Sequence, residues 1–327
     1  MTNMDTSALK EKWASLRSSV IENDINSLLL SEECLAPVFI GLDFDGKRCL
    51  ILVIPEEFPL QFVDIKKEKL SIVYFSDKNH LILSLVDSGF YDLFDDLIIS
   101  LHNGIKNIES VNKYIDSFIS VFLRWSEFFD EQNEDRLTKE LVKGLWGELY
   151  VLSRHLQEST PIKVNGDLDA WKGPYDQGRD FIFDKKDIEV KTKDAARISI
   201  RISSEYQLKP TNGKGLELHV ISVIEDPIQG LTLKGLVIEN LDLIQSLFGD
   251  KSILYKALKQ KGLSTGNIHE YDNFRFSPVE LLIFDSTKKG FPKLISGQID
   301  DAITGLKYDI NLTELDEYLL MKEILNG

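Results

Sequence analysis

Three side chains in the segment RDFIFDKKDIEVK have the types and the spacing of a divalent-metal site. They are Asp180, Glu189 and Lys191. Carboxylate oxygens suit Mg²⁺ or Mn²⁺, and such ions take one or two carboxylates together with water and substrate phosphate. A bound ion activates water for attack on phosphorus, and a lysine beside it can act as a base or stabilise the developing negative charge. The chemistry that this set would support is hydrolysis of a phosphodiester.

The alternation of apolar and charged residues in this segment predicts a hairpin of two strands, 180–184 and 187–193, with a turn at the two lysines between them. The apolar positions share one face, which must cover a core: Phe181, Phe183, Ile188 and Val190. With Asp184 opposite Asp187 in the register, we expect Asp180 opposite Lys191 and diagonal to Glu189, within roughly 4.5–8 Å. An ordinary cross-strand ion pair between Asp180 and Lys191 is the simpler alternative.

A fourth carboxylate precedes the hairpin, on a helix that we expect at 137–157. Glu148 follows Leu145 by three residues and precedes Leu152 by four, so it points into the apolar stripe of that helix. A buried, unpaired carboxylate costs several kcal/mol, and a nearby metal ion would remove that cost. Pairing with a lysine such as Lys143, or with backbone groups, is the alternative.

The order of elements extends the pattern. After the helix at 137–157 we expect three strands, at 179–184, 187–193 and 197–202. A short helix from about 204 and a fourth strand at 216–224 should follow. In this order and in these residues the chain resembles the PD-(D/E)xK superfamily, which includes many restriction endonucleases and repair nucleases. The stretches GLWGEL, WKGPYDQGRDF and EVK resemble, more narrowly, a bacterial family of PD-(D/E)xK proteins found in phage-defence gene clusters.

The resemblance implies a mixed α/β, restriction-endonuclease-like core and a Mg²⁺-dependent (or Mn²⁺-dependent) DNA endonuclease that acts with partner proteins in defence. Asp180 and Glu189 would be metal ligands, Glu148 would support the site, and Lys191 would be the base or the charge stabiliser. Arg179 stands where the motif has its proline, which has no ligand role.

A rival match to the same pattern lies near the N-terminus. Pro55-Glu56 is followed by Asp64-Ile65-Lys66, but glutamate replaces the usual aspartate. No apolar helix with an inward glutamate precedes this rival, so the later segment is the stronger candidate.

Four polar residues after the motif are candidate phosphate contacts: Lys193, Arg197, Arg201 and Gln207. The arginines share the polar face of RISIRI, where they could grip phosphate or simply be solvated. Lys193 could equally be the solvated end of its strand. Gln207 with Ser204 fits a capping box at a helix start, which is an alternative to a contact with water or phosphate.

The net charge of −15 opposes simple binding to DNA, because phosphate contacts supply most non-specific affinity. The segment between residues 171 and 215, however, contains ten basic and seven acidic residues. DNA affinity would therefore come from this local patch or from a partner protein. The alternative is a non-catalytic interaction subunit that keeps the nuclease fold and binds proteins through its acidic surface.

The length of 327 residues predicts two domains: an N-terminal α+β domain with an antiparallel sheet at 1–132, and the nuclease-like domain with a C-terminal extension at 133–327. Expected elements of the first domain are a helix at 6–20, strands near 36–44, 47–54, 59–64, 70–75 and 80–86, and helices at 88–103 and 110–130. Later we expect helices near 239–248 and 251–262 and strands near 274–287 and 306–311. The strand FSPVELLIFD is interpreted as structural. Two unpaired cysteines, no cleavable signal and no long apolar run favour a cytoplasmic protein that binds no membrane.

Overall fold

The computed structural model describes residues 4–17, 25–43, 45–56, 60, 62–129, 136–300 and 302–325. The chain divides into two compact units, Met1–Gln132 with Ser264–Gly266, and Asn133–Leu263 with Asn267–Gly327. Across the described ranges, no helix is long and apolar enough to cross a membrane. Cys34 and Cys49 are free thiols, as expected.

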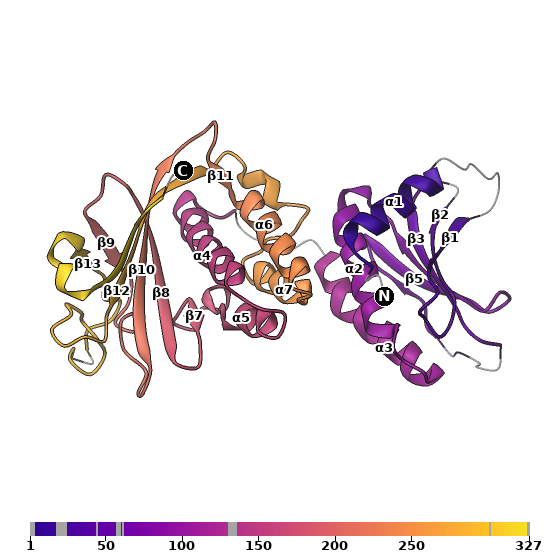
Figure 1. The fold of residues 1–327 in the computed structure, drawn as a ribbon, viewed down its shortest axis with the longest axis horizontal. Coiled ribbons are helices and arrows are strands. Elements are labelled where there is room, and N and C mark those ends of the chain that lie inside the picture. The colour runs from indigo at the N-terminus through magenta and orange to yellow at the C-terminus, as the bar shows by residue number, and fades with distance from the viewer. Residues whose placement is uncertain are drawn as a thin grey trace. The chain divides into compact units, whose positions relative to one another are not determined.

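The first unit is a six-stranded antiparallel sheet with helices on one face (Figure 1). Its strands in spatial order are β1 (Asn26–Ser31), β2 (Val38–Leu42), β3 (Arg48–Val53), β6 (His80–Leu85), β5 (Leu70–Phe75) and β4 (Ile65–Lys66). Its helices are α1 (Thr6–Arg17), α2 (Tyr91–Ile105) and α3 (Val111–Ser126), with 3₁₀ turns η1 (Ser88–Phe90) and η2 (Glu127–Phe129). The expected α+β architecture is confirmed. Strand β1 was not expected, and the strand expected at 59–64 falls partly outside the described residues.

The second unit is built on a mixed sheet. Its strands run in the order β11 (Leu231–Thr232), β12 (Arg275–Asp285), β10 (Gly215–Glu225), β8 (Lys186–Asp194) and β7 (Phe181–Ile182), and β14 (Leu319–Ile324) also pairs with β12. Strands β8 and β10 are parallel, and the other pairs are antiparallel. The mixed fold expected for a PD-(D/E)xK domain is confirmed.

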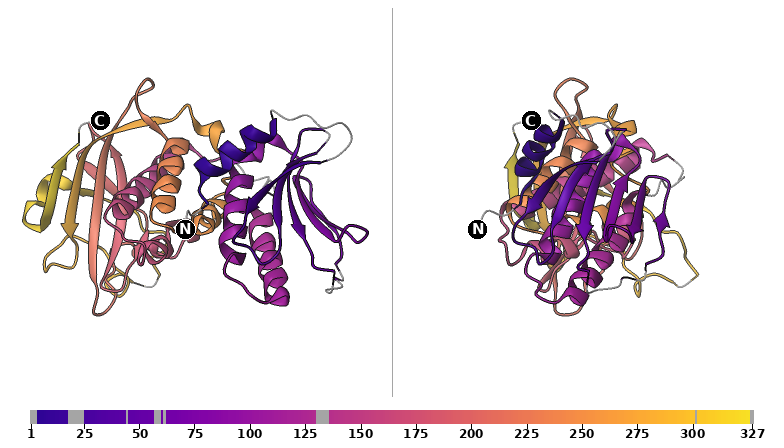
Figure 2. Two further views of the ribbon diagram at one scale, coloured as in Figure 1. Left: turned by 45° about the vertical axis from the view of Figure 1, so that its right-hand side comes forward. Right: turned by 90° about the vertical axis from the view of Figure 1, so that its right-hand side faces the viewer.

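Helices cover one face of this sheet and a two-stranded ribbon covers the other (Figure 1). The helices are α4 (Lys139–Gln157), α5 (Val164–Ala170), α6 (Leu233–Ser246) and α7 (Lys251–Gln260), with 3₁₀ turns η3 (Gly173–Tyr175) and η4 (Ile268–Tyr271). The ribbon pairs β9 (Ser199–Ile202) with β13 (Tyr308–Asn311), followed by η5 (Leu312–Glu314) and η6 (Asp316–Tyr318). The left panel of Figure 2 shows this layering from a second side. One apolar core fills the space between the sheet and the helices, and a second fills the space between the sheet and the ribbon.

Helix α4 lies very close to β8, and a glycine allows this approach. A Cβ at Gly147 would stand 1.8 Å from Oγ1 of Thr192, so any larger residue would push the helix away from the sheet. The N-terminus of α4 is capped by Thr138, whose hydroxyl accepts a hydrogen bond from the Leu141 amide. Glu148, in the middle of this helix, is thereby held near the β7–β8 hairpin.

The register expected for the hairpin is wrong by two residues. Phe181 pairs with Ile188, which places Asp180 beside Glu189 and not opposite Lys191. The amide of Phe183 donates to the carbonyl of Lys186, so the two-residue turn lies at 184–185, one residue earlier than expected. Because the error is an even number of residues, the faces of both strands stay as expected.

The short helix expected from about 204 is a turn in the structure. Gln207 does accept a hydrogen bond from the amide of Ser203, at 2.7 Å, but it closes a local turn and caps no helix. The guanidinium of Arg179 donates to the carbonyls of Tyr206 and Lys209, and Tyr206 also accepts a hydrogen bond from the amide of Lys209 at 3.2 Å, so the segment is held as a tight turn. The following proline, Pro210, further disfavours a helix. The third core strand, β9, also leaves the main sheet, so β8 pairs directly with β10.

Candidate active site

The β7–β8 hairpin places Asp180 at the edge of the sheet. Strand β7 is only two residues long and begins after Asp180. One carboxylate oxygen, Oδ2, accepts a hydrogen bond from the amide of Val190 at 2.7 Å. This hydrogen bond fixes the side chain at the start of the hairpin. The other carboxylate oxygen, Oδ1, lies beside Gly173.

Glu189 and Lys191 lie on one face of β8, two residues apart. Their side chains form an ion pair of 2.8 Å between Oε1 and Nζ, with exposed fractions of 2% and 16%. The ordinary ion pair between Asp180 and Lys191 is therefore not formed. The carboxylate of such a pair can also interact with a cation, and its ammonium can also interact with an anion.

Glu148 reaches this cluster from α4. Its Oε2 accepts a hydrogen bond from the indole Nε1 of Trp171 at 2.8 Å. Lys143, the alternative partner, binds Asp194 at 2.7 Å instead. A Cβ added at Gly173 would stand 2.0 Å from Oε2 of Glu148 and 3.2 Å from Oδ1 of Asp180. Two carboxylates thus border one small space that only a glycine leaves open.

Burial raises the pKa values of all three carboxyl groups, and repulsion between carboxylates adds to the rise for Glu148 and Asp180. Desolvation raises the pKa of Glu148 to about 7, with Glu189 adding to the rise. Desolvation also raises the pKa of Asp180 well above its usual range, and the charges of Glu189 and Glu148 add to it. Burial raises the pKa of Glu189, although Lys191 opposes the rise. Burial alone would lower the pKa of Lys191, but the carboxylates of Glu189 and Asp180 outweigh it.

The residues present fit a hard divalent cation. Their donors are carboxylate oxygens, which are the ligands of Mg²⁺ and Mn²⁺, and the space at Gly173 is bordered by two of them. In the described part of the chain, no three Asp, Glu, His or Cys side chains are gathered tightly enough to hold one ion by themselves. Two carboxylates are sufficient for Mg²⁺ when water and substrate phosphate complete its shell.

Arg179 closes the site on another side. Its buried guanidinium donates to the carbonyl of Gly178 at 2.5 Å and to those of Tyr206 and Lys209. Burial lowers its pKa, while the charge of Glu189 acts in the opposite direction. The residue in the position of the motif's proline thus ties the turn after β9 to the start of β7.

The candidate phosphate contacts lie in different surroundings. Arg201 makes a two-pronged ion pair with Asp309 in β13, at 2.9 and 3.2 Å. Arg197 lies 3.5 Å from Asp194 and is exposed. Lys193 continues the face of Glu189 and Lys191 but is buried, with 8% of its surface exposed. It is therefore no solvated strand end.

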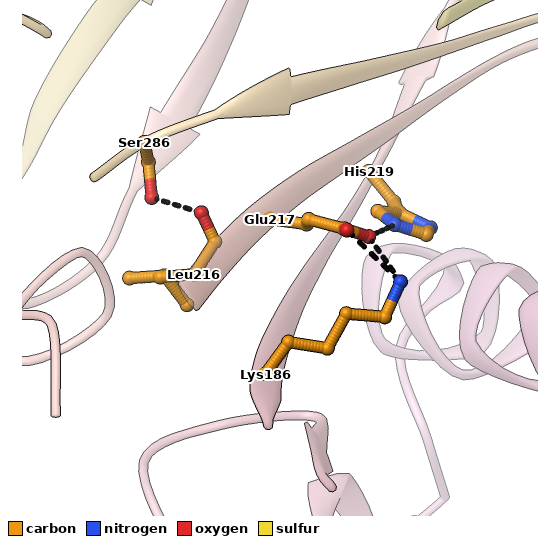
Figure 3. A network of polar contacts seen from close by, with 5 residues as sticks. All are labelled: Lys186, Leu216, Glu217, His219 and Ser286. Atoms are coloured by element: carbon orange, nitrogen blue, oxygen red, sulfur yellow. Dashed lines mark hydrogen bonds and ion pairs between the residues drawn. The ribbon is translucent and has the colours of Figure 1, made fainter. Parts of the chain in front are cut away.

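Figure 3 shows a second polar cluster, formed by Lys186 of β8 with Glu217 and His219 of β10. Glu217 accepts bonds of 2.8 and 2.9 Å from the ammonium of Lys186, and its Oε2 lies 2.9 Å from Nε2 of His219. Burial alone would raise the pKa of Glu217, but the bonds from His219 and Lys186 lower it to about 2. Lys186, at the end of the expected turn, is thus already paired.

The rival pattern in the first unit has a different setting. Asp64 is exposed and accepts a hydrogen bond from the amide of Tyr74. Glu56 is also exposed.

Two residues that shape the site were not recognised from the sequence as part of it. Trp171 and Gly173 belong to the stretch WKGPYDQGRDF, which carries part of the family resemblance but gives these two residues no role. In the structure Trp171 holds Glu148, and Gly173 provides the space between Glu148 and Asp180. The available signal was their place directly before the first core strand, which alone does not show where they point.

Residues 9–313 match the family described as "Putative PD-(D/E)XK family member (DUF4420)". Neither a curated protein nor a solved structure matches the chain.

Proposed function

Because the chain belongs to this PD-(D/E)XK family, we propose that it is a divalent-metal-dependent DNA endonuclease. Nuclease-type activity is the common property of the superfamily, and hydrolysis of a DNA phosphodiester is the specific reaction proposed for this chain. The observation that carries the proposal is the cluster of three carboxylates and one lysine around the β7–β8 hairpin. Lys191 binds Glu189 at 2.8 Å, and Glu148 and Asp180 border one space beside Gly173.

Each residue has a separate role in this mechanism. Asp180 and Glu189 hold the cation, and Glu148 completes the acidic surroundings from α4. The cation, Mg²⁺ or Mn²⁺, supplies an activated water and neutralises charge on the substrate phosphate. Lys191 presents its ammonium to the same phosphate and stabilises the negative charge that develops there. Trp171 fixes the Glu148 carboxylate through its indole N–H.

The proposed setting is the cytoplasm, as an effector of phage defence that acts with partner proteins. The acidic composition supports the need for a partner. At −15 the chain as a whole repels DNA, so a partner would have to bring the substrate to the site.

The test is cleavage of plasmid and phage DNA by the full-length protein, in Mg²⁺ or Mn²⁺, with and without the products of neighbouring genes. Asp180→Asn and Lys191→Met should each lower the rate at least about a hundredfold, as expected for loss of a metal ligand or a charge-stabilising donor. Asp184→Asn and Lys185→Met are matched controls, because both residues are exposed at the turn of the same hairpin. The controls should cleave at the wild-type rate.

Cleavage that survives both site substitutions would refute the assignment of the site. No cleavage under any condition, even with partners, would favour the second candidate, a non-catalytic interaction subunit with a nuclease fold. The observation in favour of that candidate is again the net charge of −15, which suits docking to a basic protein.

A further inference from the structure

The face of β8 that carries Glu189 and Lys191 continues into a pocket of about 290 Å³. Lys193 lies on this face one pleat beyond Lys191, about 6.6 Å along the strand, and lines the pocket. The volume is at the small end of ligand pockets. It suits one small organic group and excludes a duplex.

The ammonium of Lys193 has no partner among the described residues. The acidic charges that act on it are those of Glu280 and Asp194. Asp194 is bound by Lys143 at 2.7 Å, and Glu280 by Lys322 at 3.0 Å. Burial of such a charge without a counter-ion is costly, and it lowers the pKa of Lys193. An anion bound in the pocket would remove this cost.

The floor of the pocket is apolar and lies close to the catalytic face. Val220 in β10 pairs with Lys191 on one side and with Leu282 in β12 on the other. Leu282 is therefore two strands from Lys191, about 9–10 Å. Phe284 continues the floor along β12, and Leu312 and Leu319 line the pocket as well.

The rim carries charges of both signs. Besides Lys193 they are Arg197, Lys322, Glu280 and Asp316, so the basic groups exceed the acidic ones by one. An excess of one positive charge matches the single negative charge of a phosphodiester. The apolar floor suits a sugar and a base, whose flat faces are hydrophobic.

We propose that this pocket binds one nucleotide of the DNA strand next to the scissile bond, with its phosphate on Lys193 and its base over Leu282 and Phe284. The inference rests on the proposed function, since it takes DNA as the substrate. A nucleotide drawn out of the stack and held here would fix the neighbouring phosphate at Lys191, in the way that other enzymes hold an extruded base in a pocket.

The test is the binding of deoxynucleoside 5′-monophosphates, inorganic phosphate and deoxynucleosides to the full-length protein, measured by saturation-transfer NMR and calorimetry. EDTA is included, so that no metal ion at the neighbouring site can hold the phosphate. We expect nucleotides to bind more tightly than either phosphate or nucleosides. Lys193→Met should weaken nucleotide binding about tenfold or more, and Lys193→Arg should restore part of it. Lys185→Met, a charge loss at the exposed turn, should have no effect.

Lys193→Met should also keep or raise the melting temperature, because it removes an unpaired buried charge, so lost binding cannot be attributed to misfolding. Equal nucleotide binding by the wild type and Lys193→Met would overturn the inference, as would equal binding of phosphate and nucleotides. Cleavage plays no part in this assay. If a protein that cuts no DNA still bound nucleotides through Lys193, the nucleotide pocket would be supported and the proposed endonuclease activity would be contradicted.

Discussion

The two faces of strands β8 and β10 carry polar clusters of opposite character. On the face toward α4, Glu217 is satisfied by Lys186 and His219, and its pKa falls to about 2. The other face carries Glu189 and Lys191, and Glu148, which reaches that cluster from α4, is desolvated and repelled by Glu189, so its pKa rises to about 7. Two glutamates of the same unit, one on β10 and one on α4, thus have their pKa values displaced in opposite directions.

The difference shows which cluster stabilises the fold and which opposes it. A carboxylate whose pKa is lowered gains free energy from its partners in the folded state, and one whose pKa is raised loses it. Clusters that oppose folding persist where a ligand or a reaction needs them. The acidic cluster is therefore the candidate active site, and the Glu217 network is a structural reference on the same strands.

The largest effect should come from closing the space between Glu148 and Asp180. In Gly173→Ala the new methyl group would stand 2.0 Å from Oε2 of Glu148, so this carboxylate must move. The clash is with the end of a flexible side chain, so the fold should survive. We expect the cleavage rate to fall about a hundredfold, since small displacements of catalytic groups cost this much, with a melting temperature close to that of the wild type.

Gly144→Ala is the matched control on α4, where the added methyl group meets nothing within 4 Å. It should stabilise the protein by about 1 kcal/mol, the usual difference between the two residues in a helix, and leave cleavage unchanged. Normal cleavage by Gly173→Ala would show that the space beside Glu148 has no role in the reaction.

Much of this contrast could be predicted from local patterns. The alternation in residues 180–193 predicted that Glu189 and Lys191 share one face of a strand. The helix periodicity predicted that the side chain of Glu148 points toward the core. Both follow from the periods of strands and helices, which act over a few residues. The mixed fold followed from the order of the same elements.

The hairpin register was wrong by two residues because the turn between Phe183 and Lys186 lies one residue earlier than expected. The other features that could not be predicted depend on contacts between distant segments. In place of the expected helix after β9 there is a turn, whose carbonyls at Tyr206 and Lys209 accept hydrogen bonds from Arg179, far away in sequence. The strand FSPVELLIFD was interpreted as structural, and only its pairing with β10 makes Leu282 the floor of a pocket.

A second prediction concerns stability, where the two clusters should respond with opposite signs. Asp180→Asn removes one of several repelling charges and keeps an oxygen for the Val190 amide, so we expect a gain of about 1 kcal/mol in the metal-free protein. Glu217→Gln weakens bonds to Lys186 and His219, so we expect a loss of about 1–2 kcal/mol. Urea unfolding in EDTA, followed by hydrogen exchange of β8 and β10, measures both.

The pH dependence of the Glu217 contribution sharpens this test. Its folded pKa of about 2 lies below the usual 4.5, so the contribution is complete above pH 4.5 and is lost as the pH falls toward 2. The wild type and Glu217→Gln should therefore differ in stability at pH 7 and converge at low pH. A constant difference across this range would mean that Glu217 acts through packing and not through charge.

The smallest effect should come from the hydrogen bond that positions Glu148. Trp171→Phe removes the indole N–H that donates to Oε2 and keeps an aromatic ring in place. Groups that orient a metal site typically contribute ten- to a hundredfold to metal affinity. We expect the Mn²⁺ concentration for half-maximal cleavage to rise about tenfold, with a stability loss of about 1 kcal/mol.

Trp146→Phe is the control for the stability loss. Trp146 is equally buried on α4, but its indole donates to the carbonyl of Leu231 at 3.0 Å and not to a carboxylate. Because both variants lose a ring and a hydrogen bond, their stabilities should fall alike, and only Trp171→Phe should change the Mn²⁺ titration. If both variants shifted the titration equally, the indole of Trp171 would stabilise the fold without positioning Glu148.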